Sequence, residues 1–393
     1  MTIASPSPHS TPTPTGEELP PVHEPLIEIV VPIYNEQAVL ERSIRRLHRF
    51  LRVEMPFAWR IVIADNASTD ASPGIARSLT RSLDHVESIR LPLKGRGRAL
   101  RAAWMNSDAD VLCYMDVDLS TDLRALLPLV AGLISGHSDI AIGTRLAYSS
   151  RVVRGRKREL ISRTYNHLLR LTLGARFSDA QCGFKAVRAD VARRLLPTVV
   201  DDGWFFDTEL LVLAQRHGLR IHEVAVDWTD DTDSRVAIVP TALADLQGIA
   251  RLLVQRPAVR FLAIGIVSTA AYATLYLLLR SWMAATASNA IALAITAIAN
   301  TQANRRFTFG LRGRTGLLRQ HAAGALVYLL ALALTGGSLD LLQSIDPHPA
   351  RALEVAVLVV ASAFATVTRY LALRSWVFAR HRAKPQPLRP AVR

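Results

Sequence analysis

The sequence contains little cysteine and few aromatic residues. Cysteine occurs only at Cys113 and Cys182, outside any C-x-x-C pair, which argues against a structural zinc site and a disulfide framework. We therefore expect reduced thiols in the cytosol. Aromatic residues make up 6% of the chain and do not interleave with runs of lysine and arginine, so no nucleic-acid groove is expected, although the formal net charge is +14.

The start of the chain also lacks the features of a signal peptide. Residues 1–24 have no basic start and no apolar centre, and they are rich in proline, serine and threonine. Such a composition cannot bury enough apolar surface to order the chain, so we expect a disordered tail there.

The second half of the chain has four long apolar stretches separated by loops that carry arginine. They lie at 261–279, 290–303, 322–342 and 352–373. A helix needs about 20 apolar residues to cross a membrane, and the second stretch reaches that length only if Asn300 and Asn304 lie near its end. Arginine is concentrated before the first stretch and after the second and fourth, so the positive-inside rule places both termini in the cytoplasm. We expect four transmembrane helices in the cell (inner or plasma) membrane.

The first half alternates short apolar runs with stretches of helical spacing. The runs at 26–33, 59–64, 111–115 and 139–142 predict buried strands, and the stretches at 36–51, 68–82, 96–106 and 122–135 predict helices. This alternation predicts an α/β domain with a mostly parallel sheet covered by helices. Ligands bind such sheets outside the carboxyl ends of the strands, so chemistry is expected in the loops that follow them.

Polar residues follow the first two predicted strands directly. Tyr34, Asn35 and Glu36 come after the first strand, and Asp65 comes after the second. Asp65 could accept hydrogen bonds from a base or a ribose. The alternative is that these residues only cap helices, through Asn35 after the first strand and through Ser68 or Asn66 after the second.

A basic, glycine-rich segment, Lys94-Gly95-Arg96-Gly97, precedes the third predicted helix. Glycine and positive charge at a helix start suit a phosphate. The spacing is not that of a P-loop, so the segment alone is a weak indication.

Two carboxylates, Asp116 and Asp118, follow the third predicted strand. Residues two apart in an extended chain face the same side, so the two carboxylates repel unless a cation lies between them. Oxygen ligands select a hard ion such as Mg²⁺ or Mn²⁺, which can bridge to a diphosphate. An isolated D-x-D is common by chance, but its place at a strand end favours a metal site.

Together these motifs resemble the family 2 inverting glycosyltransferases, which have a GT-A fold. The resemblance covers roughly residues 27–236 and rests on V-P-x-Y-N-E, D-N-x-S-x-D, K-G-x-G-x-A and D-x-D in that order. The run D-x-Q-C-G-F-K at 179–185 is similar to the dolichyl-phosphate β-glucosyltransferase branch. The segment N-R-R-F-T-F at 304–309 resembles GtrA-like transmembrane domains.

The resemblance implies a role for each matching residue. The residues expected at the nucleotide sugar are Pro32, Tyr34, Glu36, Asp65, Gly95, Asp116, Val117, Asp118, Asp207 and Arg235. Asp116 and Asp118 would also hold the divalent metal. Arg145, Arg158 and Ser162 would hold the acceptor phosphate and, with the two metal aspartates, form the catalytic set.

Alternatives remain for several of these positions. Ser120 stands where the mannose synthases have glutamine, so the metal shell beyond the aspartates is open. Arg145 and Arg158 could instead lie on a solvated helix face, and the basic run at 154–158 could contact the cytosolic leaflet. Asp207 could have a purely structural role.

The expected reaction transfers glucose from UDP-glucose to a polyprenyl or dolichyl phosphate with inversion. Mannose or an N-acetylhexosamine are alternative sugars, a homo-oligomer stays open, and a bifunctional protein would also flip the lipid-linked product. A processive polysaccharide synthase would carry Q-x-x-R-W after the D-x-D, and the sequence has none. The expected divisions are a disordered tail at 1–24, the GT-A domain at 25–238, an amphipathic interfacial helix at 239–257, the GtrA-like domain at 258–380 and a basic disordered tail at 381–393.

Overall fold

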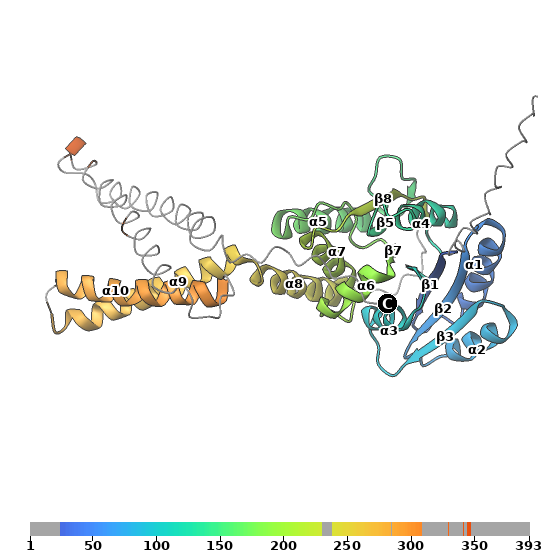
Figure 1. The fold of residues 1–393 in the computed structure, drawn as a ribbon, viewed down its shortest axis with the longest axis horizontal. Helices are drawn as coiled ribbons and strands as arrows, with labels where there is room; N and C mark the ends of the chain where they lie inside the picture. Colours follow the sequence, from blue (N-terminus) through green and yellow to red (C-terminus); the bar gives the residue numbers. More distant parts are fainter. Residues whose placement is uncertain are drawn as a thin grey trace, which may run out of the picture.

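The computed structural model describes residues 24–229, 238–283, 285–308 and 344–346, together with positions 329 and 341. Within these residues the chain forms an α/β domain and, beyond it, long helices that extend away from that domain (Figure 1). The two predicted disordered tails, apart from residue 24, lie outside the described residues, and so does Arg235.

The α/β domain is built on one large sheet. Its strands are β1 (Leu26–Ile33), β2 (Ala58–Asn66), β3 (Val86–Leu91), β4 (Val111–Met115), β5 (Ile140–Thr144), β7 (Phe184–Arg188) and β8 (Ile221–Ala225). They are arranged in the order β3-β2-β1-β4-β7-β5-β8. All neighbours are parallel except β7, which is antiparallel to both β4 and β5. A separate short parallel pair joins β6 (Val152–Val153) to β9 (Trp228–Thr229).

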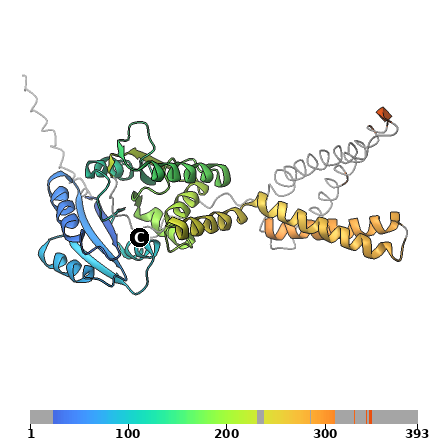
Figure 2. The ribbon, with the colours of Figure 1, turned by 180° about the vertical axis from the view of Figure 1, so that it is seen from behind.

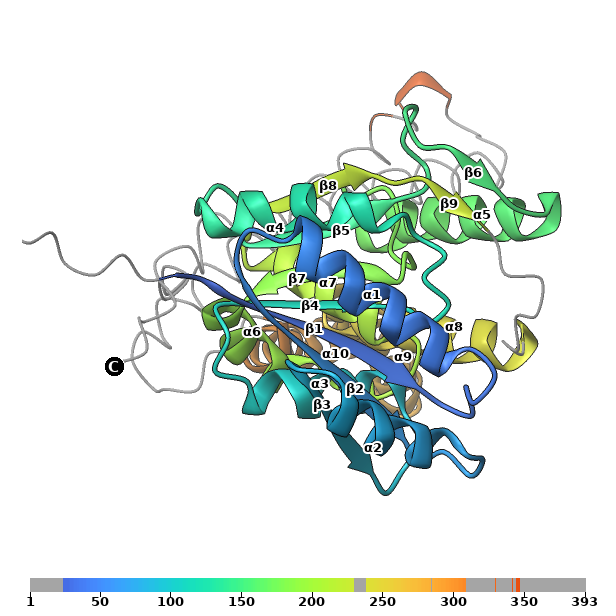
Figure 3. The ribbon, with the colours of Figure 1, turned by 90° about the vertical axis from the view of Figure 1, so that its right-hand side faces the viewer.

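Helices cover both faces of the sheet, and Figure 3 shows α1 in front of the strands. The helices of this domain are α1 (Leu40–Glu54), α2 (Ser72–Ser82), α3 (Arg96–Asn106), α4 (Leu126–Ile134), α5 (Arg156–Leu173), α6 (Ala189–Leu195) and α7 (Phe206–Arg216). Short 3-10 turns lie at η1 (Leu123–Ala125) and η2 (Leu196–Thr198). The apolar residues of α1, α2 and α4 share one buried core, and those of α3, α5, α6 and α7 share the other.

Strand periodicity explains why two cores form. In β4, Val111, Cys113 and Met115 face the core beneath α1, α2 and α4, whereas Leu112 and Tyr114 face the opposite core. Successive side chains of a strand point to opposite faces, so a continuous apolar run such as this one is buried on both sides. The predicted α/β class with a mostly parallel sheet is therefore confirmed.

Most predicted elements are confirmed, and three strands of the large sheet are missing from the prediction. The strands at 26–33 and 111–115 and the helix at 96–106 have the predicted bounds, while the strands at 59–64 and 139–142 are shifted or extended by one or two residues. The missing strands are β3, β7 and β8. Each contains charged or polar residues, such as Lys185 in β7 and Glu223 in β8, whose partners come from distant parts of the chain. Their apolar pattern was therefore too weak to indicate a strand.

Three further helices follow the sheet: α8 (Ile238–Val254), α9 (Pro257–Arg280) and α10 (Ala285–Ala303), and a π-helical turn (Asn304–Thr308) ends α10. The view from behind shows α9 and α10 lying side by side beyond α8 (Figure 2). Among the described residues, the segment Pro257–Leu279 is long and apolar enough to cross a membrane. Helices thus occupy the first two predicted spans. The spans predicted at 322–342 and 352–373 lie outside the described residues, apart from positions 329 and 341, and the domain boundaries stay predictions.

Gly248 allows α8 to pack closely on the α/β domain. A methyl group at this position would lie 2.3 Å from Cδ1 of Phe205, a ring that is only 1% exposed. Because the buried ring has no room to move, we expect Gly248→Ala to lower the free energy of unfolding by about 1–3 kcal/mol. Thermal unfolding of the full chain in detergent measures this.

The matched control is Gly74→Ala in α2, where an added methyl group meets nothing within 4 Å. Alanine in a helix interior should stabilise the chain there by about 0.5–1 kcal/mol. Effects of the same sign at both glycines would contradict the close packing of α8.

Candidate active site

The candidate site lies at the carboxyl edge of the sheet, where the strand order reverses. From β1 the chain moves to β2 and then β3 on one side, and it returns to the other side of β1 for β4. Loops at such a switch point diverge and leave a crevice between them. The residues predicted after β1, β2 and β4 are therefore brought together at one edge.

Hydrogen bonds between the loops after β1 and β2 fix their shape. The Asn35 N–H donates to Ser68 Oγ (2.9 Å), the Thr69 N–H donates to Asn35 Oδ1 (2.8 Å), and the Glu36 N–H donates to Ser72 Oγ (2.9 Å). These side chains bond to the neighbouring loop, and no side chain caps α1 or α2. The capping alternative is wrong, and α1 and α2 begin at Leu40 and Ser72, four residues later than predicted.

Asp65 lies at the end of β2 with its side chain buried. Its Oδ1 accepts a hydrogen bond from the Ser68 N–H (3.0 Å), and Arg90 Nε lies 3.4 Å from its Oδ2. Among the described residues, Oδ2 accepts no hydrogen bond. A buried acceptor of this kind is costly unless a partner arrives, which suits a ligand hydroxyl or N–H group.

The glycine-rich segment contacts both loops. The Gly95 N–H donates to Asn66 Oδ1 (2.7 Å), and Lys94 Nζ lies 3.7 Å from the centroid of the Tyr34 ring. Tyr34, Pro32 and Glu36 are half-buried at the same edge. The segment therefore places positive charge beside the predicted nucleotide-binding residues.

Arg96, the first residue of α3, is the cation closest to the predicted metal residues, and the sequence prediction chose Gly95 instead. Its guanidinium donates to Asp116 Oδ1 (2.8 Å) and lies 5.2 Å and 4.9 Å from the ring centroids of Tyr114 and Trp204. Burial disfavours its charge, yet nearby carboxylates, Asp116 first, raise the pKa of Arg96 above the ordinary value. The basic character of the segment was the available signal for this residue.

Asp116 and Asp118 open into a small pocket. Its walls are Met115, Asp116, Asp118, Leu119, Ser120, Thr121, Gly183, Phe184 and Trp228. The Asp116 side chain is 44% exposed, and the Asp118 side chain is exposed, with its Oδ1 accepting from the Ser120 N–H (3.0 Å). Crowding by protein atoms raises the pKa of the Asp116 carboxyl, Arg96 opposes this rise, and Asp118 adds to it.

The residues of this pocket suit a hard divalent cation. A Cβ at position 183 would lie 1.8 Å from Asp116 Oδ2, so only glycine leaves room for this carboxylate. The described residues contain no group of three or more His, Cys, Asp or Glu side chains suited to a metal. Two carboxylates alone match an ion that takes its other ligands from water and substrate phosphates, as Mg²⁺ does.

Asp207 lies beneath this pocket and not in it. It forms a buried ion pair with Lys185 (3.2 Å) and accepts a short hydrogen bond from the Tyr114 hydroxyl. Lys185 also donates to the Cys182 carbonyl and to Tyr114 (3.0 Å). Burial and then the Asp207 charge raise the pKa of Tyr114 well above its usual value. Among the described residues, Asp207 therefore supports Tyr114, whose ring lies against Arg96.

Arg145 follows β5 and is held by Asp179. Its Nε and a terminal nitrogen donate to the two carboxylate oxygens of Asp179 at 2.8 Å and 3.0 Å. Burial opposes the charge of Asp179, but Arg145 outweighs it and lowers the pKa of this carboxyl. Arg145 lies in a fixed position on the side of the site opposite β1, not on a solvated helix face.

Arg158 and Ser162 lie on α5, which is joined to the 179–183 segment. The Ser162 side chain is 5% exposed, and its Oγ has no hydrogen-bond partner among the described residues. Asn166, one turn further along α5, accepts from the Ala180 N–H (3.0 Å). Arg158 is half-buried. Arg154 is also half-buried, and burial and then Arg145 lower its pKa.

Helix α8 also contributes a carboxylate to this side. Asp245 is 5% exposed, its Oδ2 accepts from Gln181 Nε2 (3.2 Å), and its Oδ1 has no partner among the described residues. Burial, followed by the charges of Asp201 and Asp207, raises the pKa of Asp245 to about 7. No local sequence pattern indicates this residue, because its environment is made by distant segments.

Two family models match this chain. Residues 28–196 match "Glycosyl transferase family 2", and residues 260–378 match "GtrA/DPMS, transmembrane domain". The chain therefore combines a family 2 glycosyltransferase domain with a GtrA/DPMS transmembrane domain, and both predicted resemblances are confirmed.

Curated relatives resemble the first of these domains. The chain is 38% identical to glycosyltransferase AglD of Haloferax volcanii over 54% of this chain, and it spans only 34% of that protein's length. It is 26% identical to the dolichyl-phosphate beta-glucosyltransferase of Dictyostelium discoideum, over 59% of this chain and 75% of that protein. It is 27% identical to the dolichyl-phosphate beta-glucosyltransferase of Homo sapiens, over 53% of this chain and 69% of that protein.

Among solved structures, glucosyl-3-phosphoglycerate synthase from Mycobacterium tuberculosis, in complex with Mn²⁺, UDP and glucosyl-3-phosphoglycerate, is similar at 21% identity with a TM-score of 0.42. The match covers 59% of this chain and 78% of that one.

The raised pKa of Asp245 leads to a pH-dependent effect on stability. Between about pH 4 and pH 7 the folded chain keeps a proton that the unfolded chain releases, so the free energy of unfolding falls as the pH rises through this window. Asp245→Asn keeps an acceptor for Gln181 and removes the charge. We expect the variant to be more stable than the wild type above pH 7, by about 1–3 kcal/mol, and equally stable below about pH 4.

Thermal unfolding of both chains across this pH range checks the prediction. Asp84→Asn, at an exposed position, is the control and should leave the pH profile unchanged. A variant less stable than the wild type at every pH would show that the Asp245 carboxylate is needed in its charged form.

Proposed function

We propose that this chain transfers a hexose from a nucleoside-diphosphate sugar to a polyprenyl phosphate, with inversion at the anomeric carbon. The observation that carries the proposal is the pair Asp116 and Asp118 beside Arg96 at the switch point of the sheet. The names of the relatives favour glucose from UDP-glucose and a dolichyl-type acceptor. Mannose and N-acetylhexosamine donors stay alternatives.

On the donor side, Asp65 would accept a hydrogen bond from the nucleoside through its buried Oδ2, beside Tyr34. Asp116 and Asp118 would hold Mg²⁺ or Mn²⁺, and a bound divalent ion would neutralise charge that develops on the departing diphosphate. The cation would replace part of the contact between Arg96 and Asp116. The remaining N–H donors of Arg96 would then bind the diphosphate, because the geometry of a guanidinium matches phosphate oxygens.

On the acceptor side, Arg145, Arg158 and Ser162 would hold the phosphate of the lipid, and half-buried Arg154 would add positive charge. The buried Ser162 hydroxyl has no hydrogen-bond partner among the described residues and would donate to a phosphate oxygen. One oxygen of this phosphate forms a bond to the anomeric carbon while the bond from that carbon to the diphosphate breaks. The nucleophile is already an anion, so positioning and charge neutralisation carry the reaction and no strong general base is needed.

The GtrA/DPMS domain would keep this site at the membrane that contains the acceptor. We further propose four transmembrane helices with both termini and the catalytic domain in the cytoplasm, because arginine is concentrated before the first apolar stretch and after the second and fourth. An anchor role is favoured over lipid flipping, since the apolar stretches carry few charges.

The proposed function is tested with the purified full chain, a polyprenyl phosphate and a panel of UDP-glucose, GDP-mannose and UDP-N-acetylglucosamine. We expect transfer of one sugar, inhibition by EDTA and recovery on adding Mg²⁺ or Mn²⁺. Asp116→Asn and Asp118→Asn should each lower the rate by on the order of a hundredfold or more, because they remove a charge that holds the cation.

The control for these variants is Asp108→Asn, which changes an exposed carboxylate just before β4, at the opposite end of that strand. Its transfer rate should match the wild type. Full transfer in EDTA would exclude the metal, and no transfer from any nucleotide sugar would reject the function.

The acceptor assignment gives a separate test at Arg158. Arg158→Ala should raise the KM for the polyprenyl phosphate about ten- to a hundredfold and leave nucleotide-sugar binding unchanged, because it removes one charge-assisted contact with a phosphate. Arg158→Lys should recover only part of the loss, since an ammonium group cannot form the paired contact of a guanidinium.

The matched control is Arg156→Ala, two residues earlier on α5, where the side chain is exposed. It should have a smaller effect. Equal, small losses at both arginines would show that this run only contacts the leaflet, and weakened nucleotide-sugar binding at Arg158 would place that residue in the donor site.

A further inference from the structure

Trp204 is a large aromatic residue that stays half exposed beside the site. Its side chain is 46% exposed, and its ring centroid lies 4.9 Å from the guanidinium carbon of Arg96. Arg96 in turn contacts Asp116. Arg96 therefore covers one side of the indole ring, while nearly half of the side chain remains accessible. Arg96 also links the ring to Asp116, one of the predicted metal ligands.

The segment that carries Trp204 is held firmly in place. The Arg98 N–H and the Gly97 N–H, in the first turn of α3, donate to the carbonyls of Asp202 (3.1 Å) and Gly203 (3.3 Å). Arg98 also forms an ion pair with the Asp202 carboxylate (3.0 Å). These contacts fix the backbone that carries Trp204, and the contact with Arg96 places its ring beside the start of α3.

A second set of contacts fixes the same segment from behind. Buried Glu209 accepts hydrogen bonds from the N–H groups of Val200 (3.1 Å) and Asp201 (2.7 Å). Arg251 of α8 donates to Glu209 (2.9 Å). These polar contacts hold a segment whose apolar Trp204 ring stays exposed to solvent. Exposure of an apolar ring to water does not stabilise the fold.

We propose that Trp204 is the surface against which the sugar of the donor lies, next to a diphosphate held by Arg96. The C–H groups on one face of a hexose carry slight positive charge and pack well on the electron-rich face of an indole ring. The positively charged Arg96 would bind the diphosphate, while the Trp204 ring next to it would pack against the uncharged sugar. This assignment rests on the proposed function and names the residue that recognises the sugar part of the donor.

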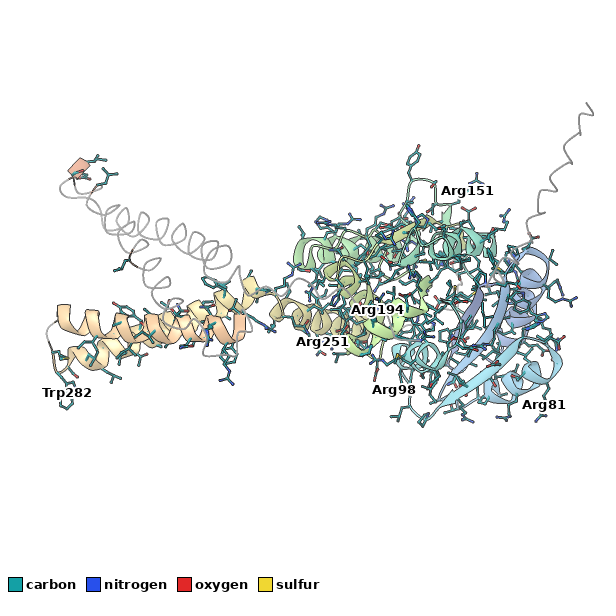
Figure 4. The ribbon with its side chains drawn as sticks, in the orientation of Figure 1. Arg81, Arg98, Arg151, Arg194, Arg251 and Trp282 are labelled. Atoms are coloured by element: carbon teal, nitrogen blue, oxygen red, sulfur yellow. The ribbon has the colours of Figure 1, made fainter. Side chains whose placement is uncertain are left out.

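The test compares binding of UDP-glucose with binding of UDP, both in Mn²⁺, to the full chain by titration calorimetry. Trp204→Leu should weaken UDP-glucose binding about three- to tenfold and leave UDP binding unchanged, because only the sugar contact is lost. Trp204→Phe, which keeps a smaller ring, should lose less. Trp282→Leu is the matched control, since this tryptophan is exposed at the far end of the molecule (Figure 4) and should change neither affinity.

Two results would overturn the inference. Equal weakening of UDP and UDP-glucose would show that the ring acts through Arg96 on the diphosphate, and unchanged binding of UDP-glucose would show that the ring does not touch the sugar. Transfer to polyprenyl phosphate is scored separately. A chain that binds UDP-glucose through Trp204 without transferring the sugar would reject the proposed function and leave this inference standing.

Discussion

The site depends on keeping a carboxylate open to a ligand at the end of a strand that is buried on both faces. Asp116 follows β4, where burial by protein atoms and then the negative charges of Asp118 and Asp207 raise its pKa against the opposing charge of Arg96. Such a group is costly without a partner, and Arg96 supplies one at 2.8 Å while Gly183 leaves the space that the carboxylate occupies. Since these partners belong to α3 and to the turn before β7, both elements must be in place for the pocket to exist.

The sequence predicts the part of this arrangement formed by the loops after β1, β2 and β4 better than the part formed by Arg145, Asp179 and Asp245. The loops after β1, β2 and β4 follow apolar runs directly, so their place at the sheet edge could be inferred from chain order alone. Arg145 and Asp179 are 34 residues apart, and their bidentate contact depends on the crossing of β5 and β7, which no local pattern indicates. The same reason hides Asp245, whose carboxylate meets Gln181 only after α8 has folded back onto the domain.

Helix α8 links the membrane segment to the site through charged contacts. It precedes α9 directly, and Arg251 near its end binds Glu209 and lies 3.7 Å from Asp201. Asp201 belongs to the segment that also meets α3 through Asp202 and Arg98, and Glu209, in the first turn of α7, accepts hydrogen bonds from the same segment. Helix α8, which leads directly into α9, is thus joined by ion pairs and by the close packing of Gly248 on Phe205 to the segment beside Arg96. A polar link of this kind fixes orientation more than it adds stability.

The charges on the two sides of the site suit different events. On the side proposed for the donor, Arg96 and Lys185 each have a carboxylate partner, so charge is balanced before a ligand binds. On the side proposed for the acceptor, Arg154 lies near Arg145. Burial and then the charge of Arg145 lower the pKa of Arg154 even though Asp179 and Glu159 oppose this effect, so like charges would oppose one another until an anion arrives. Under the proposed function the lipid phosphate enters with about −1.5 to −2 charge at neutral pH, and transfer of the sugar leaves a phosphodiester with a single negative charge. The arginines would therefore hold the substrate more strongly than the product, which would favour release of the glycosylated lipid into the membrane.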